Sequence, residues 1–254
     1  MARYMSLGKG KEKVLVLHHW FCDSTLYTSL LPYLDTEHFS WLFMDLRGYG
    51  GARDLEGSFS IKEAISDIVA LIEHLEWKQF HLVSHAMSSL IAHQFALTHP
   101  QHAKSLVSIS PLWQPPTTER VFLEDAAVLG GDAGIECIHM LTNRRYTDSV
   151  AKKMLHTWHS CSSPKARLAY LHMFSEKRPY EAIQKLPSST LFLVGEENTY
   201  RHLEKDLRHL APQVTLDYCK YAGHFMAQEA PLYLAGKLMS FLAKDEKLQS
   251  EDSA

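Results

Sequence analysis

The segment Leu82-Val-Ser-His-Ala-Met-Ser-Ser-Leu90 predicts a tight turn of the kind that presents a nucleophile between a strand and a helix. Such a turn requires small residues two places before and two places after its central residue. Centring the turn on Ala86 satisfies this requirement, because Ser84 and Ser88 then occupy the two positions. Alanine carries no atom that can attack a carbonyl group. The segment therefore predicts the shape of a nucleophile turn without its nucleophile.

Four further motifs flank this turn in the chain. They are His18-His-Trp-Phe21, Asp45-Leu-Arg-Gly-Tyr-Gly50, Gly195-Glu-Glu-Asn198 and Ala222-Gly-His-Phe225. Together with Ser84-His-Ala-Met-Ser88, they resemble five recurring turns of the α/β-hydrolase superfamily and occur in the same order. The resemblance spans nearly the whole chain, and the ordered set is specific although each motif alone is weak.

The resemblance implies a role for each matching residue. His224 resembles the general base, and Asn198 stands where the superfamily has the acid that orients this histidine. Trp20 and Met87 would supply the two backbone N–H groups of an oxyanion hole. Glu197 is the other candidate for the orienting acid, although it lies one place out of register.

Three departures from the superfamily pattern change the expected chemistry. Ala86 cannot attack a substrate, and Asn198 can orient an imidazole but cannot stabilise its protonated form by charge. An Asp-to-Asn change at the equivalent place in a serine protease lowers turnover about 10⁴-fold. Glycines of the elbow and oxyanion turns are also replaced, and His19 thereby places a polar ring near the site entrance. We expect His19, Trp113 and Trp158 to contact the substrate.

Alternating apolar strands and amphipathic helices predict an α/β fold with a mainly parallel sheet covered by helices on both faces. Residues 115–185 break this alternation with helical patterning alone, which predicts a helical cap inserted after the strand at 105–110, the sixth strand in the superfamily's order. The core domain then comprises residues 1–114 and 186–254. The basic run Lys9–Lys13 predicts a solvated hairpin turn. Strands are expected at 13–18, 41–45, 80–84, 105–110, 190–194 and 214–218, and helices at 61–75 and from 87 to the break before Pro100.

The overall composition limits the classes of partner. With 254 residues, 46% of them hydrophobic, the chain is long enough for a substantial core, and its net charge of −3 favours neither nucleic acid nor a membrane surface. The four cysteines share no close spacing, which indicates free thiols in a reducing cytoplasm. The sixteen histidines show no zinc-ligand spacing. We therefore expect a cytoplasmic protein without metal or cofactor that acts on a small molecule, and the oligomeric state stays open.

These features predict a serine hydrolase of small, fairly apolar carbonyl substrates (an ester, a lactone or a C–C bonded ketone), in a form that lacks its nucleophile. An engineered Ser-to-Ala change and a natural replacement both account for Ala86. One alternative is a cofactor-independent oxygenase or lyase, in which His224 acts as a base without a covalent intermediate. The other is a non-catalytic protein that binds a small molecule.

Overall fold

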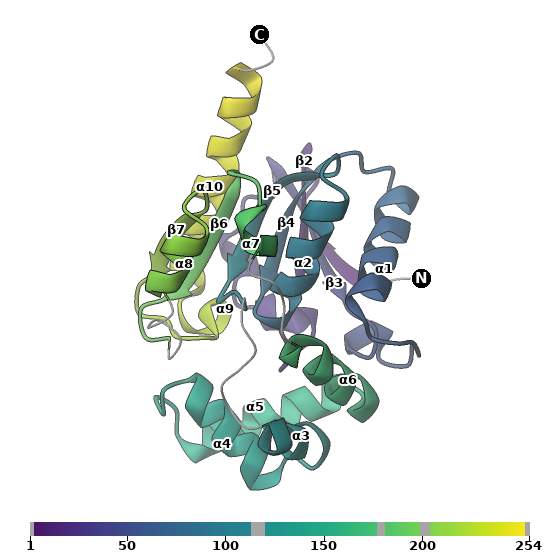
Figure 1. Ribbon diagram of the computed structural model, residues 1–254, viewed down its shortest axis with the longest axis vertical. Helices are drawn as coiled ribbons and strands as arrows, with labels where there is room; N and C mark the ends of the chain where they lie inside the picture. Colours follow the sequence, from purple (N-terminus) through teal and green to yellow (C-terminus); the bar gives the residue numbers. More distant parts are fainter. Residues whose placement is uncertain (1–2, 113–119, 177–180, 199–203, 252–254) are drawn as a thin grey trace.

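The computed structural model describes residues 3–112, 120–176, 181–198 and 204–251. Its centre is a seven-stranded sheet in the order β1-β3-β2-β4-β5-β6-β7 (Figure 1). All neighbouring strands run parallel except β1, which is antiparallel to β3. The α/β fold class predicted from the sequence is therefore confirmed. The strands are β1 (Arg3–Leu7), β2 (Glu12–Leu17), β3 (Phe39–Asp45), β4 (Phe80–His85), β5 (Ala103–Ile109), β6 (Thr190–Gly195) and β7 (Thr215–Cys219).

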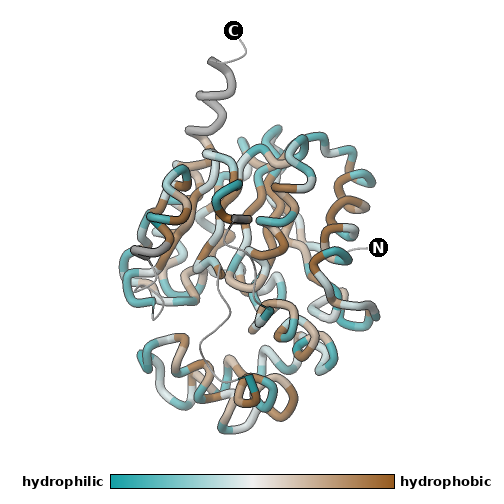
Figure 2. The backbone as a smooth tube through the Cα atoms, in the orientation of Figure 1, coloured by the Kyte–Doolittle hydropathy of each residue, from teal (hydrophilic) through white to brown (hydrophobic). Residues whose placement is uncertain are grey.

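Helices cover both faces of this sheet. One face packs against α1 (Ile61–His74) and α2 (Met87–Thr98), and the other packs against α9 (Met226–Glu229) and α10 (Pro231–Glu251). Burial on both sides explains the unbroken apolar runs of the central strands, and every residue of β4 is buried. Figure 2 shows hydrophobic stretches along these strands and along α1, with hydrophilic residues in the connecting loops. No helix in the described part of the chain is both long and apolar enough to cross a membrane.

The predicted helix boundaries on either side of β4 are confirmed. The Ser60 side chain accepts a hydrogen bond from the Glu63 N–H at 3.2 Å, which starts α1 where the capping pattern placed it. The Glu63 carboxylate in turn accepts from the Phe59 N–H at 2.8 Å, one residue earlier than the simplest capping box. The next helix, α2, starts at Met87 and ends at Thr98, before Pro100.

The hairpin turn predicted at Lys9–Lys13 is wrong. The segment before this run forms the edge strand β1, which was not expected and which pairs with β3 and is not a neighbour of β2. The connecting loop crosses the start of β3, where a Cβ on Gly10 would lie 1.9 Å from the His38 carbonyl oxygen. Glycine permits this close approach of two backbone segments, which the sequence alone did not reveal.

Of the five described helices between β5 and β6 in the chain, four gather beyond one end of the sheet (Figure 1). The described residues of this stretch contain no strand. The four helices follow β5, which covers most of the strand expected at 105–110. Near the end of the predicted cap range, α7 (Glu181–Gln184) packs against α2 of the core. The four helices are α3 (Arg120–Val128), α4 (Gly131–Leu141), α5 (Asp148–Cys161) and α6 (Pro164–Ser175), and α8 (Glu204–Leu210) follows β6.

Buried histidines make the stability of this fold depend on pH. Burial lowers the pKa of His93 to about 3, and of His81 and His224 to about 4. These rings stay neutral in the folded protein, but in the unfolded chain they take up protons below a pKa of about 6.5. Their stabilising contribution is complete above that pH and is lost as the pH falls toward the folded-state pKa. The same direction holds for His18, His19 and His85.

We expect the His93→Gln variant to lose part of this pH dependence. As the pH falls from 6.5 to 5, a ring that stays neutral in the folded protein lowers the free energy of unfolding by about 2 kcal/mol. Urea unfolding at pH 7 and pH 5 measures the difference, and the variant should lose less stability on acidification than the parent. His74→Gln, at an exposed position on α1, is the matched control. An unchanged pH dependence in His93→Gln would contradict the assignment.

Candidate active site

Ala86 forms a strained turn between β4 and α2. Its φ of +49° and ψ of −111° lie in a region that residues with a Cβ rarely adopt. Ser84 and Ser88 are fully buried, and the Ser88 hydroxyl accepts a hydrogen bond from the His85 N–H at 3.0 Å. The Ser89 hydroxyl donates to the Ala86 carbonyl at 2.6 Å. The turn predicted around Ala86 is therefore present and is fixed by serine side chains on its carboxyl side.

We expect the Ala86→Gly variant to be more stable than the parent by about 1 kcal/mol. Relief of a strained backbone contributes about 1–3 kcal/mol, and the greater freedom of glycine in the unfolded chain removes part of that gain. Ala92→Gly, in the interior of the same helix, is the matched control and should be destabilising. Urea unfolding compares the two variants, and a less stable Ala86→Gly would mean that the turn is not strained.

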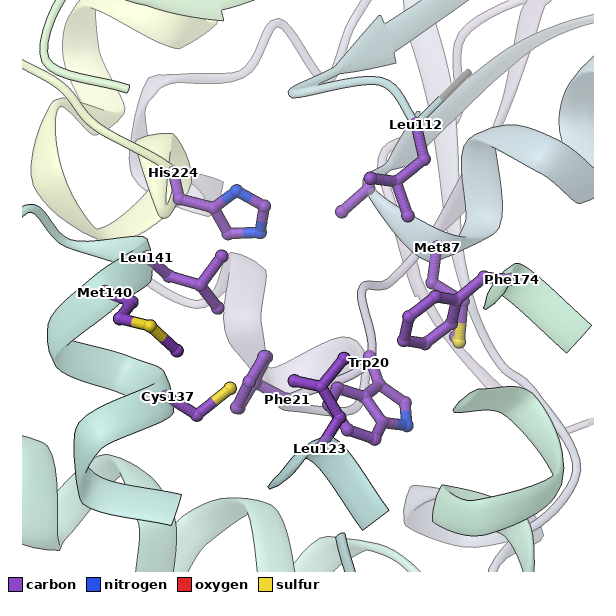
Figure 3. A pocket seen from close by; sticks show the side chains of 11 residues that line it. Trp20, Phe21, Met87, Leu112, Leu123, Cys137, Met140, Leu141, Phe174 and His224 are labelled. Atoms are coloured by element: carbon purple, nitrogen blue, oxygen red, sulfur yellow. The ribbon is translucent and has the colours of Figure 1, made fainter. Parts of the chain in front are cut away.

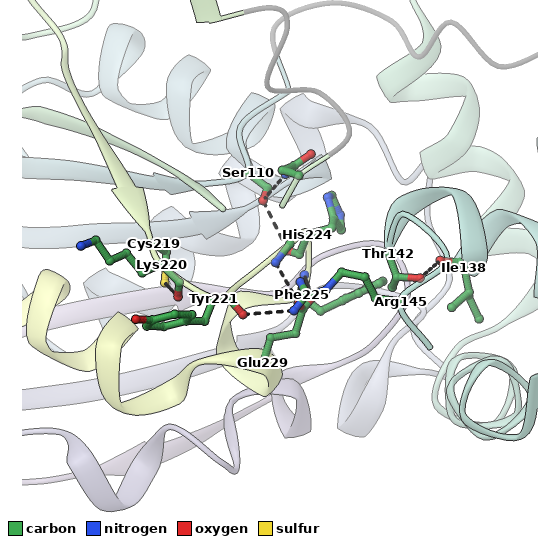
Figure 4. Close-up of polar contacts among 12 residues, drawn as sticks. Ser110, Ile138, Thr142, Arg145, Cys219, Lys220, Tyr221, His224, Phe225 and Glu229 are labelled. Atoms are coloured by element: carbon green, nitrogen blue, oxygen red, sulfur yellow. Dashed lines mark hydrogen bonds and ion pairs between the residues drawn. The ribbon is translucent and has the colours of Figure 1, made fainter. Parts of the chain in front are cut away.

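The loop that carries His224 is held by Glu229. The Gly223 and Phe225 N–H groups, on either side of His224, donate to the Glu229 carboxylate at 2.8 and 3.0 Å. Arg145, in the segment between α4 and α5, donates to the same carboxylate at 2.7 Å (Figure 4). The Glu229 side chain is only 3% exposed. Glu229 thus fixes the main chain around His224 and connects it to the cap helices.

The hydrogen bond predicted between Asn198 and the His224 ring is not made at Nδ1. Asn198 Nδ2 donates to the Ser110 hydroxyl at 3.0 Å, and that hydroxyl donates to the His224 carbonyl at 3.3 Å (Figure 4). His224 Nδ1 is buried and has no hydrogen-bond partner among the described residues. Glu197 is exposed at the surface. Neither candidate acid therefore acts on Nδ1, and Asn198 reaches the His224 main chain through Ser110.

Three buried imidazoles meet near the Ala86 turn. The centroid of the His85 ring lies 5.4 Å from that of His224 and 4.8 Å from that of His19. His19 Nδ1 accepts from the Phe21 N–H at 2.8 Å, so its Nε2 carries the hydrogen. His85 Nε2 lies 2.8 Å from the His224 carbonyl, which makes this nitrogen a donor. Burial lowers the pKa of all three rings, and the neighbouring imidazoles add repulsion at His19 and His85. All three rings are therefore neutral at pH 7.

The main chain of Trp20 is held by the turns that the sequence motifs predicted. The Tyr49 hydroxyl, from the Asp45–Gly50 motif, donates to the Trp20 carbonyl at 2.8 Å. His18 Nε2 accepts from the Leu46 N–H at 3.1 Å, which joins this motif to the end of β2. Met87 is the first residue of α2, so its N–H has no acceptor within the helix. Trp20 and Met87 both line the cavity at Ala86.

This cavity lies between the core and the cap helices and is almost entirely apolar (Figure 3). It encloses about 580 Å³, its open mouth included. None of the described residues that line it carries a permanent charge. His224 and Leu141 approach it from one side, and Met87 and Phe174 from the other. The lining residues are Trp20, Phe21, Ala86, Met87, Leu112, Leu123, Cys137, Met140, Leu141, Phe174 and His224.

Two of the three predicted substrate contacts, His19 and Trp158, do not line the cavity at Ala86. Trp158 is fully buried behind the cavity wall, with its ring 4.6 Å from Trp20 and 4.4 Å from Phe21 between centroids. His19 borders a neighbouring hollow between the core and α5 instead of the cavity at Ala86. Trp113 lies outside the described residues. Sequence reasoning missed the cavity residues of α4, although Cys137, Met140 and Leu141 have the spacing of one helix face.

Comparisons with known proteins support the hydrolase resemblance. A family model described as "alpha/beta hydrolase fold" matches residues 13–130. The chain is 30% identical over 110 residues to the probable lysophospholipase BODYGUARD 1 of Arabidopsis thaliana, covering 41% of this chain and 24% of that protein. It is 29% identical over 108 residues to a serine hydrolase-like protein of Danio rerio, covering 41% of this chain and 32% of that protein. The matched segments thus span about a quarter to a third of these two relatives. A thermophilic esterase from Thermogutta terrifontis, solved with malate bound, has a similar structure, with a TM-score of 0.81 and 22% identity over 96% of this chain and 93% of the esterase.

Proposed function

Because the chain belongs to the α/β-hydrolase superfamily, we propose that it binds a small, fairly apolar carbonyl compound in a serine-hydrolase site that lacks the nucleophile. The observation that carries this proposal is the apolar cavity that Ala86, His224, Trp20 and Met87 all line. A ligand oxygen directed at the Trp20 and Met87 N–H groups would bring its carbonyl carbon toward Ala86. With a methyl group at position 86, the ligand is held but not attacked.

The lining of the cavity supports an uncharged ligand. Apolar side chains surround the space, and the lining residues in the described part of the chain offer no cation to a carboxylate or phosphate group. Burial of an unpaired charge there would cost several kcal/mol. An ester, a lactone or a ketone with an apolar substituent meets these conditions.

A cofactor-independent oxygenase or lyase receives less support. Such an enzyme needs His224 to remove a proton from the bound ligand. A pKa of about 4 makes this imidazole a weak base, and no carboxylate among the described residues contacts its Nδ1 to strengthen it. Oxygen uptake with a candidate substrate would be the direct evidence for this alternative.

Binding of a short-chain aryl ester tests the proposed function. Cys137 faces the cavity from α4, so the Cys137→Phe variant fills part of the space, and we expect it to weaken binding at least about tenfold. Leu129→Phe, at a cap position that is 76% exposed, is the matched control and should bind as the parent does. Titration calorimetry measures both affinities. Equal affinity of the parent and Cys137→Phe would place the ligand outside this cavity.

A fluorophosphonate probe tests the missing nucleophile separately. The parent chain should form no adduct at position 86, whereas the Ala86→Ser variant should be labelled there, as peptide mass spectrometry would show. If a folded Ala86→Ser variant binds the ester but is not labelled, the site binds the ligand without the geometry for nucleophilic attack.

A further inference from the structure

Two thiols and a carboxylate meet where α5 contacts the loop after β2. Cys22 and Asp23 belong to that loop, and Cys161 is the last residue of α5. One ligand atom from each of the three residues lies within 4.8 Å of the other two. All four cysteines of the chain are free, and Cys22 and Asp23 are buried. This group is separate from the cavity at Ala86 and takes no part in the function proposed above.

The separations within this group approach those around a bound metal ion. Cys22 Sγ lies 3.8 Å from Asp23 Oδ1. In a tetrahedral zinc site, with Zn–S of about 2.3 Å and Zn–O of about 2.1 Å, sulfur and oxygen ligands lie about 3.6 Å apart and two sulfurs about 3.8 Å apart. The His19, His85 and His224 rings form no such compact set, although they are also buried together. Small side-chain movements at the cysteine pair are therefore enough to enclose an ion.

The chemistry of the three ligands selects the kind of ion. Two thiolates and one carboxylate suit a soft or borderline divalent cation of the zinc class and disfavour magnesium and calcium. The three negative charges exceed the two charges of the ion by one, and the Arg167 guanidinium lies close enough to Cys161 to interact with it electrostatically. The Thr25 hydroxyl, 3.7 Å from Cys22 Sγ, or a water molecule can complete the tetrahedron.

A route for the ion is also present. Cys22 borders the hollow between the core and α5, together with His19, Tyr146 and Met154. In the metal-free protein, Cys161 Sγ donates to the Trp158 carbonyl at 3.4 Å, and Cys22 Sγ donates to Asp23 Oδ1. On binding, both thiol protons pass to solvent and two metal–sulfur bonds form, with no change of oxidation state. Asp23 can keep the hydrogen bond that it accepts from the Thr25 N–H at 2.9 Å.

We propose that Cys22, Asp23 and Cys161 form a binding site for a thiophilic divalent cation. The ion would join α5 of the cap to the loop after β2, at a point two residues after Trp20. Because α5 also carries Trp158, which packs against Trp20, the bound ion would hold the cap on the wall of the cavity.

Titration with Cd²⁺ tests the site directly. We expect one equivalent to bind with the ultraviolet charge-transfer absorption of cadmium thiolates. This absorption should be lost in Cys22→Ser and in Cys161→Ser, and it should persist in Cys219→Ser, which removes a buried free thiol on β7. The Asp23→Asn variant keeps an oxygen for the Thr25 N–H and both thiols, and should bind at least about tenfold more weakly.

Zinc binding to the folded protein provides the second readout. At a concentration about 100-fold above the Kd, Zn²⁺ should raise the melting temperature by about 5–10 °C in the parent and in Cys219→Ser, but not in either serine variant of the pair. Equal Cd²⁺ binding by the parent and the two serine variants would overturn the proposal. So would oxidation of the two thiols to a disulfide in the presence of Zn²⁺ without metal uptake.

Discussion

The Ala86→Ser variant is expected to cleave a short-chain aryl ester at least about 10²-fold faster than the parent chain. The substitution returns a hydroxyl to a turn whose shape is already formed, at a cavity that His224, Trp20 and Met87 also line. The rate should remain well below that of a complete catalytic triad, because His224 Nδ1 has no carboxylate partner among the described residues. Loss of that charge alone costs about 10⁴-fold in a serine protease.

The pH profile of this variant follows from the pKa of His224. A base with a pKa of about 4 is already deprotonated at pH 6, so the rate should stay flat from pH 6 to pH 8. Addition of Asn198→Asp to the variant places a carboxylate next to Ser110, which contacts the His224 carbonyl. The negative charge should raise the pKa of His224 and increase the rate of ester cleavage. The pH at which this rate begins to rise should then be higher.

Initial rates of the parent, Ala86→Ser and the two double variants with Asn198→Asp and His224→Ala measure these effects. Ala86→Gly is the matched control, because it changes the same position without adding a hydroxyl. If Ala86→Ser stays at the parent rate and does not respond to His224→Ala, acyl transfer is the wrong chemistry for this site. A binding function would then account for the cavity.

Removal of the Glu229 carboxylate is expected to have the largest effect on stability. Glu229→Ala leaves the Gly223 N–H, the Phe225 N–H and the Arg145 guanidinium without their acceptor. Because two of these donors are backbone groups in a closely packed loop, we expect the free energy of unfolding to fall by about 3–5 kcal/mol. Urea unfolding measures the loss, and Ala86→Ser activity in the same background reports the displacement of His224.

Arg145→Ala separates the buried and exposed parts of this contact. The Arg145 side chain is 33% exposed, so its ion pair with Glu229 is partly screened by solvent and should contribute less than about 1 kcal/mol. Similar losses in Arg145→Ala and Glu229→Ala would show that the ion pair, and not the two backbone hydrogen bonds, stabilises the loop.

Motifs that fix a backbone turn could be predicted from the sequence, whereas contacts between distant segments could not. The small residues around Ala86 and the capping pattern at Ser60 act over a few residues, so both features are visible in the chain. Strand β1 became recognisable only through its pairing with β3. The predicted contact between Asn198 and the His224 ring is not made at Nδ1, and Asn198 instead contacts Ser110 at the end of a different strand.

Contacts made by the cap helices were even harder to predict from the sequence. Trp158 was predicted to touch the substrate because it is a large aromatic residue in a helical segment. Its place behind Trp20 depends on how α5 rotates, and no local motif sets that rotation. Glu229 lies five residues after His224 and was visible in the sequence, but its role appears only once the loop closes on it.

Trp20 is hydrogen-bonded to both sides of the cavity. Its carbonyl accepts from Tyr49 of the core, and its indole Nε1 donates to the Arg167 carbonyl of α6 at 2.9 Å. Any outward swing of the cap would therefore pull on the residue that we propose as an oxyanion donor. Under that proposal, entry of the ligand and alignment of the donor are coupled through Trp20. A substitution that shifts α6 by a fraction of an ångström could thus retune the pocket without altering one residue that lines it.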